Sequence, residues 1–160
     1  MKQVLSSLII LFFLSTFSNL YCQDAEVPAV FQLGENEDLY NDLANEYSLT
    51  LLEAAGNDLQ QAFTHWLNLM VEMETYADQI KYDIKGVKVW FHVFFSPDGS
   101  IKHIGYLLRD DSRNVDSAEL SAFFKSFINK GKKIAVSADK KFSFYTGATF
   151  PTYVQRASGK

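Results

Sequence analysis

The sequence predicts an α+β domain in which helices pack on an antiparallel sheet. Three observations support this fold class. Residues 38–82 carry apolar side chains at helical spacing, with a break at Gly56-Asn57. Residues 86–108 change to the two-residue period of strands and enclose the turn sequence Ser-Pro-Asp-Gly. A third helical segment and a final strand follow, so the expected order is helix, helix, strand, strand, helix, strand.

Residues 1–22 have the composition of a secretory signal peptide. Lys2 precedes a run without charge that extends to Tyr21. We expect cleavage between Cys22 and Gln23, and therefore a periplasmic or secreted protein. An uncleaved anchor and a lipid attached to Cys22 are the alternatives, and the bulky Tyr21 before the cysteine disfavours the lipid.

Length and charge exclude several classes of protein. The 160 residues are enough for one domain. Without residues 1–22 the chain has 14 basic and 19 acidic residues, a net charge of −5. This balance argues against nucleic acid and anionic membranes as partners. The same part of the chain has no cysteine, so packing rather than disulfides must hold it together.

The region before the strands is expected to be mainly helical. Residues 23–37 contain proline, glycine and several acids, and we interpret them as an extended leader. One helix is expected over 38–55 and a second from a cap at Asn57 or Asp58 to about Tyr82. Two amphipathic helices joined by a short turn should form an antiparallel helical hairpin over 38–82.

The turn between the two strands predicts a register. A type I turn followed by Gly99 in the left-handed conformation pairs Ser96 with Ser100. Paired residue numbers then sum to 196 along the hairpin. In this register the ring of Phe91 covers Gly105, a common way to shield bare backbone in a strand.

No catalytic or metal-binding constellation is evident. In the predicted register His92 and His103 point to opposite faces of the sheet, and His65 has no second ligand one helical turn away. Asp110 and Asp111 lie on a loop, where nothing apolar would shift their pKa values. We therefore expect a non-enzymatic protein with no cofactor and no metal.

The first strand carries large apolar side chains on both of its faces, so two covers are needed. In one arrangement the helix capped by Asp116 covers one face and the N-terminal helical hairpin covers the other. In the alternative, the second face is exposed and binds a second copy of the chain or another protein. The apolar residues expected on this second face are Trp90, Phe94, Ile104 and Tyr106.

Residues 86–151 resemble the C-terminal domain of TonB, the periplasmic energy transducer. The resemblance rests on the hairpin VKVWFHVFFSPDGSIKHIGYLL, the helix VDSAELSAFFKSFI and the final strand KKFSFYTGATFP. It implies the strand, strand, helix, strand order of that family and a periplasmic setting. It also implies that a partner strand binds at the sheet edge, and in the family this partner is a peptide of an outer-membrane receptor.

The last strand, 142–150, is the expected binding surface. An edge strand offers free N–H and C=O groups to a partner strand. The alternative is that it pairs internally or with a short strand at 134–136. Pro151 ends the strand, and residues 152–160 are assigned to a tail. The residues expected to contact a partner are Phe142, Phe144, Tyr145, Thr146, Gly147, Ala148 and Phe150.

These observations lead to three functional hypotheses. The first is a non-enzymatic protein-interaction module, linked to transport through outer-membrane receptors. The second is a small-ligand-binding protein or an enzyme, with an aromatic pocket around Trp90 and Tyr106. The third is a structural protein of the bacterial envelope.

Overall fold

The structure, a computed structural model, describes residues 27–153. This part of the chain combines a mixed five-stranded sheet with four helices, which confirms the predicted α+β class. The expected signal peptide and its cleavage point lie outside the described residues. Between residues 27 and 153 no helix is both long and apolar enough to cross a membrane.

Three long strands form the centre of the sheet. Strand β3 (Lys88–Phe95) lies between β4 (Ile101–Leu108) and β5 (Phe142–Thr149) and runs antiparallel to both. Two short strands, β1 (Val30–Gln32) and β2 (Leu49–Thr50), add in parallel to the outer sides of β4 and β5. The strand order is β1-β4-β3-β5-β2, so the outer side of β5 is shared with only one very short strand.

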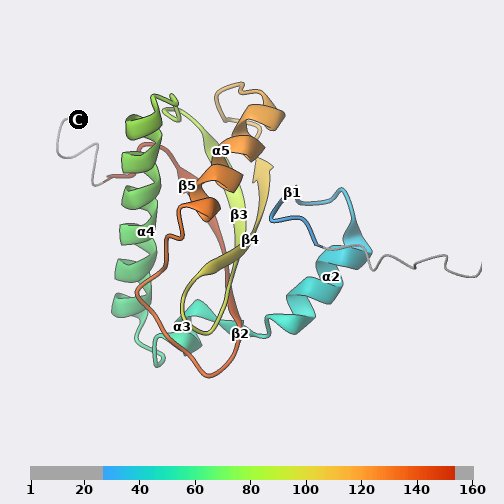
Figure 1. The fold of residues 1–160 in the computed structure, drawn as a ribbon, viewed down its shortest axis with the longest axis vertical. Helices are drawn as coiled ribbons and strands as arrows, with labels where there is room; N and C mark the ends of the chain where they lie inside the picture. Colours follow the sequence, from blue (N-terminus) through green and yellow to red (C-terminus); the bar gives the residue numbers. More distant parts are fainter. Residues whose placement is uncertain (1–26, 154–160) are drawn as a thin grey trace, which may run out of the picture.

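The four helices cover the two faces of the sheet unequally. Helices α4 (Leu59–Ile80) and α5 (Ser117–Asn129) pack side by side on one face, and α2 (Glu37–Glu46) lies against the other (Figure 1). The short α3 (Leu51–Ala54) follows β2 directly. The side chain of Asp58 caps α4 by accepting the N–H of the third residue of the helix, as the sequence predicts.

The antiparallel helical hairpin expected over 38–82 does not form. The first helix ends at Tyr47, and β2 follows before Thr50 begins α3 with a capping box that Glu53 completes. Tyr47 is only 4 % exposed, because its ring packs 5.2 Å from the ring of Phe94 on the sheet face opposite α4. The helical spacing in this region therefore belongs to three separate helices, of which α2 lies across the second face.

Both ends of the described chain are fixed to the domain. The segment 23–37, expected to be an extended leader, contributes β1 and the start of α2. Thr152, expected to lie in a tail, is 6 % exposed and donates its backbone N–H and its hydroxyl to the buried carboxylate of Glu74. The hydroxyl bond measures 3.1 Å. These donors satisfy two buried carboxyl oxygens, whose burial without partners would be costly.

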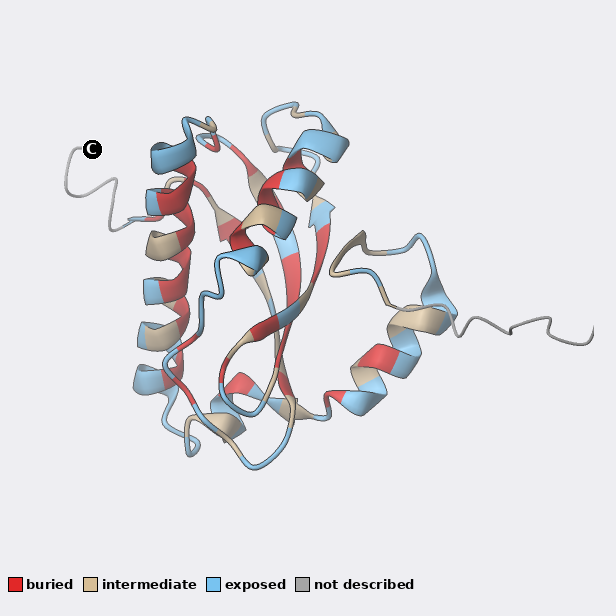
Figure 2. Cartoon of the chain, in the orientation of Figure 1, coloured by how far each residue is buried: buried red, intermediate tan, exposed pale blue. Residues whose placement is uncertain are grey.

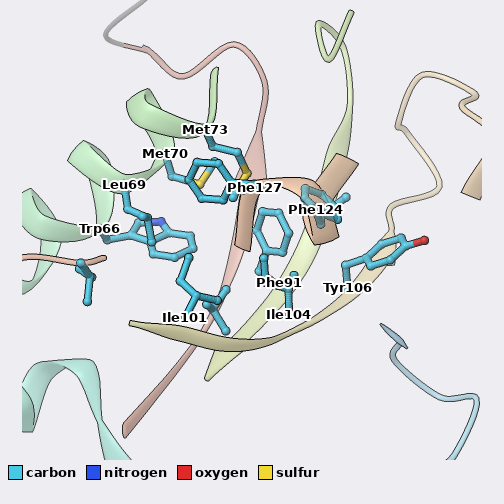
Figure 3. Packing of buried hydrophobic residues seen from close by; sticks show 14 of the residues in the cluster. Trp66, Leu69, Met70, Met73, Phe91, Ile101, Ile104, Tyr106, Phe124 and Phe127 are labelled. Carbon is cyan, nitrogen blue, oxygen red and sulfur yellow. The ribbon is translucent and has the colours of Figure 1, made fainter. Parts of the chain in front are cut away.

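The main core lies between the sheet and the pair α4 and α5, whose buried sides face the strands (Figure 2). Phe91, at the middle of β3, is fully buried there, between Trp66 of α4 and Phe124 of α5 (Figure 3). Its ring centroid lies 6.2 Å from that of Trp66 and 5.2 Å from that of Phe124. We call the face of β3 that contains Phe91 the core face.

A bulge changes the register of the hairpin. Next to the turn the pairing agrees with the prediction, because Phe95 lies opposite Ile101. An irregularity between Phe94 and Phe95 then moves the remaining pairs by one residue. A shift of one residue exchanges the faces of a strand. The prediction that His92 and His103 point to opposite faces is therefore wrong: both lie on the second face, the face of β3 that carries Trp90 and Phe94.

The same shift separates residues that were expected to lie together. Ile104 and Tyr106 were predicted beside Trp90, but both are fully buried on the core face. The hydroxyl of Tyr106 donates to the backbone oxygen of Ser117 at 3.0 Å, under α5. Trp90 and Tyr106 lie on opposite faces of the sheet, so the predicted aromatic pocket between them does not exist.

The turn at Gly99 has the predicted conformation and a tight environment. Its φ is +80°, and the N–H of Ser96 donates to the oxygen of Ser100 at 2.8 Å. A side chain at Gly99 would overlap the backbone oxygens of Ile134 and Val136, which pass directly over the turn. The region 134–136, predicted as a short strand, is held here by a bond from Ile134 N to Gly99 O but forms no regular strand.

We expect Gly99→Ala to lower the free energy of unfolding by about 3 kcal/mol, because the new side chain meets both left-handed strain and fixed backbone. Gly56→Ala is the matched control. Gly56 has a φ of +71°, but nothing lies within 4 Å of its would-be Cβ. This control should lose only about 1 kcal/mol, the cost of the conformation itself. Urea denaturation of both variants measures the difference, and equal losses would show that the segment over the turn yields freely.

Candidate partner-binding edge

The segment 27–50 wraps around the second face and both edges of the sheet, and we call it the N-terminal clasp. It adds β1 to one edge, crosses the face as α2, and adds β2 to the other edge (Figure 1). Phe31 of the clasp covers Gly105, whose added Cβ would lie 3.0 Å from the Phe31 ring. The prediction that Phe91 covers Gly105 is wrong, because the bulge places Phe91 opposite Tyr106 instead.

A chain of hydrogen bonds holds α2 to the sheet. The hydroxyl of Tyr40 lies 2.9 Å from Nδ1 of His92, and Nε2 of His92 lies 3.1 Å from Oγ of Ser143. Oγ of Ser143 donates to the backbone oxygen of Tyr47 at 3.3 Å. Because that hydroxyl proton is used, Ser143 accepts from Nε2–H, and Nδ1 accepts the proton of Tyr40. Burial lowers the pKa of His92 to about 4, so the ring is neutral near pH 7 and these bonds place its proton on Nε2.

Beyond the clasp, part of the second face is exposed. Leu107, Trp90 and Gly147 lie side by side on β4, β3 and β5. Trp90 is 40 % exposed and Leu107 is 45 % exposed, and Tyr145 beside them is 54 % exposed. The rings of Trp90 and Tyr145 are parallel within 2°, with centroids 6.2 Å apart. These side chains form an apolar row that leads to the outer edge of β5.

The indole of Trp90 also lies over Gly147. A Cβ added to this glycine would be only 3.0 Å from the Trp90 ring. The ring therefore occupies the space that a side chain at position 147 would take, and it shields the backbone of Gly147 near the edge of the sheet. On its other side, the guanidinium of Arg109 lies 5.6 Å from the Trp90 ring centroid.

A shallow hollow of about 320 Å³ adjoins Trp90, lined by Leu107, Leu108, Arg109, Asp110 and Asp111. Its charged groups neutralise one another. Asp111 accepts from Lys88 at 2.8 Å and from Arg109 at 3.1 Å. The bond from Lys88 lowers the pKa of Asp111 below its usual value. Asp111 is therefore held between two cations beside the apolar row.

The backbone hydrogen bonds show which groups of β5 point outward. Phe150 N donates to Val87 O at 2.9 Å, and Phe150 O accepts from Gly86 N at 2.8 Å. Both groups of Phe150 thus point toward the side of β3. In an antiparallel pair this direction alternates from residue to residue. The N–H and C=O groups of Tyr145, Gly147 and Thr149 therefore point to the outer edge, away from β3.

Strand β2 covers only the beginning of this edge. It pairs Leu49 with Phe142 and Thr50 with Ser143, and then turns away into α3. Within the described residues 27–153 no strand pairs with 144–149 on the outer side. Residues 144–149 contain no charge and no proline, the features that usually protect an open edge from other strands.

The structure divides the residues that the sequence assigned to partner contact. Phe142, Ala148 and Phe150 point into the core and are at most 8 % exposed, so their side chains are not available to a partner. Phe144 is half-buried against Trp66, with ring centroids 5.1 Å apart. The remaining assigned residues, Tyr145, Thr146 and Gly147, are at least partly exposed.

The sequence interpretation did not include Thr149, Leu107 and Arg109 among the site residues. Thr149 belongs to the same parity as Tyr145, so strict alternation along the last strand would have identified it. Leu107 lies beside Trp90 only because of the bulge in the hairpin, which no local signal in the sequence indicates.

Among residues 27–153 no group of three or more His, Cys, Asp or Glu side chains could hold a metal ion. The side chains of His92 and His103, although on one face, are separated by Phe94, whose ring contacts both. The nearby Ser143 and His92 are joined to Tyr40 and Tyr47 beneath the clasp. This arrangement fastens the clasp to the sheet.

The sequence matches no protein-family model, and searches of curated proteins and of solved structures give no match. The candidate site is accordingly described by its own geometry. It consists of the outer edge of β5 over 144–149 together with the adjoining apolar row of Leu107, Trp90 and Tyr145.

Proposed function

We propose that this protein is a periplasmic or secreted, non-enzymatic interaction module. It binds an extended segment of another protein, which adds as a strand to the outer edge of β5. The observation that carries this proposal is the open edge itself, where Tyr145, Gly147 and Thr149 direct their backbone donors and acceptors outward. A row of backbone N–H and C=O groups along a strand edge forms its hydrogen bonds with a second extended chain.

The apolar row gives the added strand a side-chain contact. The residue of the partner opposite Gly147 would extend its side chain over the second face, beside the indole of Trp90 and the ring of Tyr145. Both rings are exposed and carry no charge. Cross-strand pairs of aromatic and apolar residues typically contribute about 0.2 to 1 kcal/mol each. A large apolar side chain at that position of the partner therefore fits best.

We further propose a TonB C-terminal-like arrangement for β3, β4, α5 and β5. The support is the order of these elements along residues 86–151, together with the sequence resemblance. In that family the partner is a peptide of an outer-membrane receptor, and we propose the same class of partner here. The N-terminal clasp and α4 are additional to that arrangement. Helix α4 covers part of the core face of the sheet, and the clasp covers part of the second face.

Photo-crosslinking in living cells tests the proposed function. A photoreactive phenylalanine analogue replaces Tyr145 in one variant and Leu59 in a control. Leu59, at the start of α4, is 73 % exposed and belongs to neither β5 nor the apolar row. We expect a crosslink from position 145 to another envelope protein, identified by mass spectrometry, and none to the same protein from position 59.

Two outcomes would contradict this proposal. A product only between two copies of the chain would show that self-association closes the edge. The absence of any product specific to position 145 would mean that the edge binds no protein in the cell.

A further inference from the structure

The contact between the N-terminal clasp and β5 is short, and it lies between α2, which precedes it, and the fully buried Leu51 of α3, which follows it. Only two residues of β2 pair with β5. An ion pair between Glu46 and Lys141 lies beside this contact and is exposed to solvent, so it contributes little. The buried attachment of α2 is the Tyr40, His92, Ser143 chain together with the packing of Leu43 and Tyr47 on Phe94, whereas β1 holds the start of the clasp to β4.

We propose that protonation of His92 opens the N-terminal clasp and thereby extends the free edge of β5 from 144–149 to 142–149. Acid would in this way regulate the strand-binding site. The role of the longer edge in binding rests on the proposed function. The opening of the clasp does not, because it depends only on contacts within this chain.

Protonation removes the acceptor on which the attachment depends. The neutral ring accepts the hydroxyl proton of Tyr40 at Nδ1, whereas the charged ring carries a proton on both nitrogens and accepts none. The Tyr40 hydroxyl must then turn its proton away and accept from Nδ1–H, so the bond between α2 and β3 reverses its direction. The charged ring would remain only 8 % exposed beneath the clasp, and this cost of burying a charge favours the open form, in which water reaches the ring.

The surroundings of His92 offer no charge that would stabilise an imidazolium. From α2 the titratable group facing it is Tyr40, and from β5 it is Tyr145, whose ring centroid lies 5.6 Å away. From β4, His103 lies beyond Phe94, and Glu46 of α2 is paired with Lys141. Burial is accordingly the cause of the low pKa of His92, with no opposing contribution from a carboxylate.

The pKa of His92 in the open and in the closed form sets how strongly acid favours opening of the clasp. With the clasp open, the pKa of His92 returns toward the ordinary value of about 6.5. The closed form has a pKa of about 4. Linkage between these two values raises the opening equilibrium constant by up to about 30-fold when the pH falls from 8 to 5. The sign is fixed, because the open form binds the proton more tightly than the closed form.

Thiol labelling tests this proposal on the purified chain without any partner. In a chain with Cys22→Ser, Leu43→Cys places one thiol on the buried side of α2, where the native side chain is 2 % exposed. Asp42→Cys, at an exposed position of the same helix, corrects for the effect of pH on the reagent. Ala77→Cys, at a fully buried position of α4, reports unfolding of the whole domain.

We expect the corrected labelling rate of the Leu43→Cys variant to rise about 30-fold from pH 8 to pH 5. The Ala77→Cys variant should not follow it, and His92→Gln, which cannot take up a proton at these pH values, should abolish the rise. An unchanged rate, an equal rise with His92→Gln, or an equal rise in the Ala77→Cys variant would each overturn the proposal. A clasp that opens as expected while position 145 crosslinks no partner would leave this inference standing and reject the proposed function alone.

Discussion

Phe91→Ala is expected to lower the free energy of unfolding by about 4 kcal/mol, the typical loss for a large ring removed from a packed core. Phe91 is fully buried at the centre of β3. Its ring contacts Trp66 of α4, Phe124 of α5 and Phe150 after β5, so it joins both core helices to the sheet. Few residues connect as many elements, and the cavity left by alanine could not close without moving them.

Urea denaturation of the purified chain measures this loss. Tyr145→Ala is the control, because it removes an aromatic ring of the neighbouring strand that is 54 % exposed and outside the core. The control should change stability by no more than about 0.5 kcal/mol. If the two variants lost equal stability, the core would not be centred between the sheet and the pair α4 and α5.

The second large effect concerns binding, and it comes from a pair of proline substitutions. Tyr145→Pro removes an N–H that points to the open edge, which a sheet tolerates. Thr146→Pro removes an N–H that points to β3 and belongs to the internal ladder. We expect Thr146→Pro to lower the free energy of unfolding by about 3 kcal/mol and Tyr145→Pro by less than about 1 kcal/mol.

In binding, by contrast, we expect Tyr145→Pro to have a large effect although its effect on stability is small. With the photoreactive residue moved to position 149, Tyr145→Pro is expected to reduce the crosslink yield at least about tenfold, since one backbone hydrogen bond and the Tyr145 ring contact are lost together. The variant must at the same time unfold cooperatively, with a thermal midpoint lowered by no more than a loss of about 1 kcal/mol implies. A folded Tyr145→Pro variant that captures its partner normally would show that β5 does not bind by strand addition.

Local signals in the sequence were sufficient for much of the fold. Gly99 sets the turn and Asp58 caps α4, because each acts through its own few neighbours. The two-residue period of residues 86–95 identified β3 as a strand, with large apolar side chains on both of its faces. These features depend on contacts close in the chain or on burial of a whole face, and both leave a clear periodic pattern.

The errors have a common physical cause, which is contact between distant segments. The first predicted helix breaks after Glu46, because Tyr47 packs on Phe94 and Leu49 pairs with Phe142. The hairpin register shifts at a bulge that the turn sequence does not encode. Neither event has a local signal, and a helical spacing of apolar residues does not tell whether two consecutive helices face the same side of a sheet.

The candidate site was predicted in outline and corrected in detail. The last strand was identified from its sequence, and Tyr145 and Gly147 do lie at its open edge. The side chains of Phe142 and Phe150 serve the core instead, because they share the parity of Ala148 and therefore lie on the core face of the sheet. The clasp over His92 was missed, since it is built from a segment that was interpreted as a leader and a helical hairpin.

Residue-resolved amide hydrogen exchange, measured on the free chain and on its complex with the captured partner, tests the central claim most directly. In the free chain Tyr145, Gly147 and Thr149 should exchange quickly, while Phe144 and Ala148, whose amides face β3, exchange slowly. In the complex the three outward amides should slow by a factor of at least about one hundred, and the inward amides should change little. Outward amides that stay fast in the complex would contradict strand addition at β5.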